Sequence, residues 1–80
     1  MKVFFRRSSQ KYLANLDISL RAKILVAIEK LPNQGDIKRL KGQKSYDLFR
    51  LRVGKFRVVY FWEGDYLEIV SINTRGDIYK

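Results

Sequence analysis

The sequence contains no cysteine and no histidine. Without cysteine the chain has neither disulfides nor thiolate metal sites. Without histidine it lacks the commonest metal ligand and the usual general base at neutral pH. Its acidic residues are scattered along the chain and show no paired-carboxylate pattern. We therefore expect no metal and no cofactor, and most hydrolase mechanisms are without support.

Long apolar runs and nucleotide-binding fingerprints are also absent. No run approaches the roughly 18 residues needed to span a membrane, and there is neither a P-loop nor a dinucleotide-binding motif. The opening stretch MKVFFRRSSQ has too short an apolar run for a signal peptide and is typical of a strand. A length of 80 residues corresponds to one domain. We expect a single cytoplasmic domain over residues 1–80, with no membrane partner.

Positive charge is what the chain contains in excess. Lys and Arg number 17 against 8 Asp and Glu, which gives a net charge of +9 at pH 7. The hydrophobic content of 46% is that of a folded protein rather than a disordered one. On charge alone, the imbalance favours a polyanionic partner, which could be RNA, DNA, an acidic protein or a membrane surface.

The spacing of apolar and turn-forming residues predicts the order β-α-α-β-β-β. A strand over residues 2–6 is followed by a helix that Ser8 or Ser9 can cap and a second helix that Asp17 can cap. The second helix ends before Pro32 and carries one apolar stripe, formed by Leu20, Ile24, Ala27, Ile28 and Leu31. After a polar, basic connection, three strands are expected, at about residues 46–53, 56–62 and 66–74.

Tight turns join these last strands, so that part of the sheet is expected to be antiparallel. The predicted fold class is therefore α+β. Two N-terminal helices pack as an antiparallel pair on one side of a mainly antiparallel, four-stranded twisted sheet.

The stretch RLRVGKFRVVYF, residues 50–61, predicts a β-hairpin around a two-residue Gly54-Lys55 turn. Alternation of side chains then divides the hairpin into two faces. The first face pairs apolar and aromatic residues and should pack on the helices: Val53 with Phe56, Leu51 with Val58, and Phe49 with Tyr60. The second face carries Arg52 opposite Arg57 and Arg50 opposite Val59, and continues with Leu48 and Phe61.

Three arginines thus share one face, and nothing in the hairpin itself neutralises them. Like charges placed directly opposite each other cost stability, so this arrangement needs an explanation. Solvated charges on an exposed sheet are one reading. The other is a phosphate site, because guanidinium groups hold phosphate bidentately and stabilise charge on a pentavalent phosphorus. Arg75 would join this face if Trp62 paired with Tyr66, a register that the sequence leaves open.

The stretch RLKGQKSYDLFRLRVGKFRVVYFWEGDYLEIVSINTRGDIYK, residues 39–80, closely resembles the second half of the RelE/ParE toxin superfamily. The motifs that carry the resemblance are LKG, LFRLRVGKFRVVY and TRGDIY. The preceding helix pair matches the usual layout of the family, so the resemblance covers essentially the whole chain. It implies the toxin of a type II toxin–antitoxin system with a RelE-like fold. RelE-like members cut mRNA in the ribosomal A site, without metal, by 2′-hydroxyl attack, whereas ParE-like members poison DNA gyrase.

Carried over by position, the RelE-type catalytic residues fall on Arg50, Arg52, Arg57, Arg75 and Tyr79. Some members have lysine where this chain has Arg50 and Arg52, and arginine in a protein does not act as a base. The identity of the general base is therefore open. We expect a metal-independent, ribosome-dependent mRNA interferase. The alternatives are a ParE-like gyrase inhibitor without nuclease activity, or a non-catalytic basic nucleic-acid-binding module.

Two further sets of residues are candidates for partner contacts. The first set is basic and consists of Lys38, Arg39, Lys41, Lys44 and Lys55. These residues are either solvated or contact the backbone of ribosomal RNA. The second set is apolar and lies beside the arginines, where an exposed patch usually marks a binding surface. It consists of Leu48, Val59 and Phe61, which we expect to anchor a cognate antitoxin through a segment that is both acidic and apolar.

Overall fold

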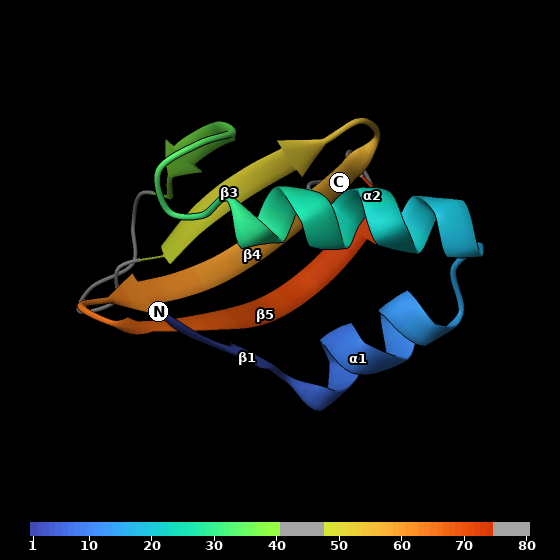
Figure 1. The fold of residues 1–80 in the computed structure, drawn as a ribbon, viewed down its shortest axis with the longest axis horizontal. Helices are drawn as coiled ribbons and strands as arrows, with labels where there is room; N and C mark the ends of the chain where they lie inside the picture. The colour runs from blue at the N-terminus through green and yellow to red at the C-terminus, as the bar shows by residue number, and fades with distance from the viewer. Residues whose placement is uncertain (41–47, 75–80) are drawn as a thin grey trace.

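The computed structural model describes residues 1–40 and 48–74 of the chain, and they form one mixed sheet with both helices on the same face (Figure 1). The α+β class and the helix–sheet layering are as predicted. The elements in order are β1 (Lys2–Phe5), α1 (Arg7–Ala14), α2 (Ile18–Glu29), β2 (Asp36–Arg39), β3 (Leu48–Val53), β4 (Phe56–Glu63) and β5 (Tyr66–Thr74).

The sheet has five strands, not the four expected, in the order β1-β5-β4-β3-β2. The additional strand is β2, which pairs antiparallel with β3 at the sheet edge. It lies within residues 33–44, the stretch predicted to be a polar connection. Its four residues DIKR contain a single apolar side chain, because an edge strand buries little. Strand β1 forms the other edge and is parallel to β5, whereas the remaining pairs are antiparallel.

Different hydrogen bonds hold the two helices in place. The side chain of Asp17 accepts a hydrogen bond from the Ser19 backbone N–H at the start of α2, as predicted. A hydrogen bond from the Ser19 hydroxyl, together with this backbone bond, holds the pKa of Asp17 below its ordinary value. Ser9, in contrast, is not a cap. It is fully buried inside α1 and its hydroxyl donates to the Ile69 carbonyl, which fastens α1 to β5.

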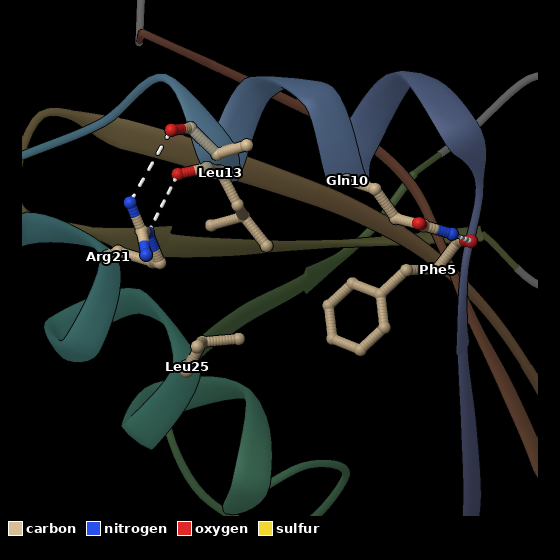
Figure 2. Close-up of a pocket in the computed structure, with 6 residues that line it drawn as sticks. Phe5, Gln10, Leu13, Arg21 and Leu25 are labelled. Atoms are coloured by element: carbon tan, nitrogen blue, oxygen red, sulfur yellow. Dashed lines mark hydrogen bonds between the residues drawn. The ribbon is translucent and has the colours of Figure 1, made fainter. Parts of the chain in front are cut away.

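Arg21 of α2 links the two helices. Its guanidinium donates to the carbonyl oxygens of Leu13 and Ala14, as Figure 2 shows, and to that of Leu16. These carbonyls belong to the last turn of α1 and the residues after it, where the helix leaves its C=O groups without helical partners. The shallow pocket of about 340 Å³ beside Arg21 has mainly apolar walls. The pocket therefore marks the place where the two helices pack together, and Arg21 has a structural role.

A β-bulge in β5 decides which residues of this strand face the helices. The sequence left the register of β5 open, and the structure pairs Glu63 with Tyr66 across a two-residue turn, so Trp62 is not the partner of Tyr66. Between Val59 and Tyr60 of β4 the register shifts, because Val70 is an extra residue on β5. Beyond the bulge, Ile72 enters the core, where it is 3% exposed.

The core lies between the helices and the inner face of the sheet. Its members from α1 and α2 include Leu13, Ile24 and Ile28, and those from the central strands include Leu51 and Val58. The apolar stripe predicted for the second helix is thus the face that packs on the sheet. No helix in residues 1–40 or 48–74 is long and apolar enough to cross a membrane.

Candidate phosphate-binding face

The β3–β4 hairpin has the register predicted from the sequence. Gly54 adopts φ +59° in the two-residue turn, where glycine meets no steric penalty. Arg52 is the direct partner of Arg57, Arg50 of Val59, and Leu48 of Phe61. We call the side of the sheet that carries these residues, opposite the helices, the arginine face.

Only one of the three arginines is exposed, which corrects the expectation of an exposed cluster. Arg52 is exposed, but Arg50 and Arg57 are only 7% and 8% exposed. Both lie on strands with a neighbour on each side, so their long side chains are surrounded by other side chains of the sheet. A buried guanidinium has less freedom to reorient, which favours a fixed anion site over a mobile one.

Asp36 on β2 partly neutralises the arginine face. It is the direct partner of Arg52 in the β2–β3 pair. Its carboxylate lies 3.5 Å from Nη1 of Arg50 and 3.9 Å from Nε of Arg52, and its backbone carbonyl accepts a further hydrogen bond from Arg50. This contact was not predicted because strand β2 was not predicted, although the alternation of Asp36, Ile37 and Lys38 is the period-2 pattern of a strand.

The predicted RNA- and ribosome-binding residues do not form one surface. Lys38 and Arg39 belong to β2 and not to a loop, and successive strand residues point to opposite faces. Lys38 pairs with Arg50 on the arginine face, whereas Arg39 lies on the helix side with its guanidinium 5.9 Å from the Phe49 ring. Lys55 is exposed in the hairpin turn. Lys41 and Lys44 lie outside the described residues.

The predicted antitoxin anchors Leu48, Val59 and Phe61 lie together on the arginine face and are each partly exposed. The remaining two catalytic candidates, Arg75 and Tyr79, lie outside the described residues. Asn73, two residues before Arg75, is described, and the bulge places it directly beside Arg57.

An aromatic cluster at the other end of the same face was not anticipated. The Phe4 ring lies 5.2 Å from that of Tyr66, and the Phe61 ring lies 6.0 Å from Tyr66. Phe4 and Tyr66 are adjacent only because β1 pairs in parallel with β5, a contact across more than sixty residues. No local pattern in the sequence signals such a pairing.

A chain of hydrogen bonds holds the Tyr66 ring in place. The Tyr66 hydroxyl donates to Glu68 Oε1 at 3.0 Å, and Arg6 Nε donates to Glu68 Oε2 at 2.5 Å. The hydrogen bond from Arg6 holds the pKa of Glu68 below its ordinary value, so this carboxylate is ionised at neutral pH. The hydrogen bond to Glu68 in turn raises the pKa of Tyr66.

Chemically, the arginine face is suited to binding a phosphate ester. It combines two buried guanidinium groups with a third that is exposed, and such groups bind phosphate oxygens in a bidentate manner. Among residues 1–40 and 48–74, no group of three or more acidic side chains could hold a metal ion. Tyr60, on the opposite side, is fully buried and is a core residue.

Comparison with known proteins places this architecture in a family. The sequence model described as "ParE toxin of type II toxin-antitoxin system, parDE" matches residues 3–79. Toxin RelE3 of Methanocaldococcus jannaschii is 31% identical over 86 residues, which cover 99% of this chain and 96% of that protein.

Two solved structures share the fold closely. The archaeal RelE–RelB complex from Pyrococcus horikoshii OT3 has a TM-score of 0.75 at 26% identity, over 95% of this chain and 96% of that chain. The RelB–RelE antitoxin–toxin complex from Methanococcus jannaschii has a TM-score of 0.75 at 28% identity, over 95% and 94%. On the match over residues 3–79 and the nearly full-length relative, this chain belongs to the RelE/ParE superfamily of toxins from type II toxin–antitoxin systems.

Proposed function

We propose that this toxin is a metal-independent, ribosome-dependent endoribonuclease that cleaves mRNA in the A site. The observation that carries the proposal is the convergence of Arg50, Arg52 and Arg57 on one sheet face. RNA supplies its own nucleophile, the 2′-hydroxyl. The protein then has to orient the phosphate, stabilise its growing charge and assist proton transfer.

In the proposed reaction, the 2′-hydroxyl loses its proton, its oxygen bonds to the adjacent phosphorus, and the bond to the 5′ oxygen breaks. The products are a 2′,3′-cyclic phosphate and a new 5′-hydroxyl end. Arg52, Arg57 and Arg75 orient the phosphate and stabilise the transition state, with Arg50 assisting. Tyr79 stacks on or polarises the substrate nucleotide. The proton of the 2′-hydroxyl passes to water or to a group other than these arginines, since a guanidinium remains protonated. The 5′ oxygen takes up a proton from water as its bond to phosphorus breaks.

The proposed ribosome contacts come from the basic side chains Lys38, Arg39, Lys41, Lys44 and Lys55. They bind phosphates of ribosomal RNA without reading its sequence, which makes the binding sensitive to salt. Action on the ribosome places the protein in the cytoplasm.

The proposed partner in the silent state is a cognate antitoxin. The support is that both similar archaeal toxins were solved as RelB–RelE complexes. An antitoxin segment with acidic residues near the arginines and apolar residues on Leu48, Val59 and Phe61 would mask the site. Hydrogen exchange with and without the product of the adjacent gene tests this. Protection confined to the helices, with residues 48–61 unchanged, would refute direct masking.

The nuclease proposal is tested by expressing the toxin in cells and mapping mRNA 5′ ends. New ends inside codons of translated messages are expected, and Arg57→Ala, compared at equal protein level, should not produce them. Intact mRNA together with stalled replication would support a ParE-like gyrase inhibitor, the reading that the ParE family match favours. No effect on growth or mRNA would support a non-catalytic basic module.

A further inference from the structure

We infer that the aromatic cluster of Phe4, Phe61 and Tyr66 is a base-stacking platform for single-stranded RNA whose phosphates lie on the arginine face. The inference rests on the proposed action on RNA and adds a second binding site to it. The platform would take unpaired nucleobases that flank the phosphate held by the arginines.

Two rings of the platform are exposed to solvent. Phe4 is 48% exposed and Tyr66 is 39% exposed. Rings that served only to stabilise the β1–β5 pair would contribute more if they were buried, because removing apolar surface from water is favourable. Exposed aromatic rings on a sheet surface are the device by which several RNA-binding domains stack bases.

The same face carries an excess of positive charge. The cations that the register places there are Lys2, Lys38, Arg50, Arg52 and Arg57, and the acidic residues are Asp36, Glu63 and Glu68. Two of these carboxylates are already engaged by arginines, Asp36 by Arg50 and Arg52, and Glu68 by Arg6. The face is therefore complementary to a polyanion, and single strands are bound by this combination of a basic track and aromatic rings.

The spacing between the arginines and the platform, and the rigidity of the Tyr66 ring, also suit a bound single strand. Arg57 and Phe61 lie four residues apart on β4, on the same face, which corresponds to about 13 Å along the strand. A few nucleotides of an extended strand cover this distance, with Val59 between the two ends. The Arg6–Glu68–Tyr66 hydrogen bonds already order the Tyr66 ring, so less freedom is lost when a base stacks on it.

The test uses binding of short RNA oligonucleotides, measured by fluorescence anisotropy, and compares normal RNA with RNA carrying abasic sites but the same phosphates. The wild-type protein should prefer the base-containing strand about 5- to 150-fold, the range that corresponds to one base–aromatic stack. Tyr66→Leu and Phe4→Leu keep apolar cover on the sheet but should remove most of that preference. Tyr12→Leu, a partly buried aromatic on α1, is the matched control and should retain it.

Nuclear magnetic resonance of the wild-type protein provides a readout that needs no variant. Ring protons of Phe4 and Tyr66 should shift on adding base-containing RNA and not on adding abasic RNA. Equal binding of both strands, no measurable RNA binding, or an unchanged preference in both Leu variants would overturn the inference. Unchanged RNA preference with weakened antitoxin binding would assign the platform to a protein partner instead. Because binding is read without cleavage, these outcomes are distinct from an absence of new mRNA ends, which would defeat the nuclease proposal.

Discussion

At the scale of single residues, Arg52 and Arg57 lie directly opposite each other on neighbouring strands. This costs stability, and the side chain of Arg57 is nearly fully buried. Arg57→Lys keeps the charge but loses the planar, bidentate fork. We expect mRNA cleavage to fall roughly 10- to 150-fold, the equivalent of about 1.5–3 kcal/mol for a hydrogen bond to a charged group. Quantified 5′-end mapping measures the fall, and a thermal melt serves as the control. Undiminished cleavage in a folded variant would remove Arg57 from the site.

Tyr60 provides a second prediction at this scale. Its hydroxyl is buried without a hydrogen-bond partner among residues 1–40 and 48–74, and burial raises its pKa to about 12. The folded pKa lies above the unfolded value of 10.0, so the contribution to stability is complete below pH 10 and is lost as pH rises toward 12.

Tyr60→Phe removes the unpaired hydroxyl and should stabilise the protein by about 1 kcal/mol or more. It should also weaken the alkaline loss of stability between pH 10 and 12. Urea denaturation at a series of pH values measures both effects. A variant less stable than wild type at pH 7 would show that the hydroxyl has a partner in solution.

At the scale of elements, strand β2 brings a carboxylate to the arginines. Asp36→Asn removes the ion pairs to Arg50 and Arg52, and for so exposed an acid the loss of stability should stay within about 1 kcal/mol. Freed guanidinium groups should bind RNA more tightly at low salt. Glu29→Gln makes the same change of charge at an exposed position at the end of α2, on the other side of the sheet, and is the control. Equal gains in both variants would show a general effect of net charge.

The inward face of β3 determines how the hairpin is held on the helices. Leu51 is 1% exposed, and a Cβ added at Gly35 would lie 2.7 Å from its Cδ1, so it is tightly surrounded. Leu51→Ala should cost about 2–5 kcal/mol in unfolding free energy. Val26→Ala, on a side chain that is 50% exposed on α2, should change it by less than about 0.5 kcal/mol. Chemical denaturation compares them, and similar values would contradict the assignment of the faces.

At the scale of the whole molecule, the net charge of +9 governs association with RNA. If Arg50, Arg52 and Arg57 each contact one phosphate, the logarithm of the binding constant should fall with the logarithm of salt concentration with a slope near −2, at about 0.7 per phosphate. Titrations with a short single-stranded RNA from 50 to roughly 300 mM salt give this slope. A slope near zero would mean that the arginines do not bind phosphate.

The bulge in β5 shows where sequence reasoning reached its limit. Leu67, Ile69 and Ile72 are all buried. The spacing between buried residues is two from Leu67 to Ile69 and three from Ile69 to Ile72, and this change is the only sign of the bulge in the sequence of β5. An uninterrupted period of two from the turn would have put Ile72 beside Arg57. Because Val70 is inserted, Ile72 lies in the core and Asn73 lies beside Arg57.

The sequence by itself determined the hairpin register, the three arginines on one face and the apolar stripe of α2. All of these depend on side-chain periodicity and one two-residue turn, which act over short stretches of chain. The tertiary structure alone decided that β2 pairs with β3 and brings Asp36 to Arg50 and Arg52, and that β1 lies beside β5 and brings Phe4 to Tyr66. It also decided that Arg50 and Arg57 are buried. The physical reason is that strand pairing and burial depend on residues distant in the chain, which no local pattern encodes.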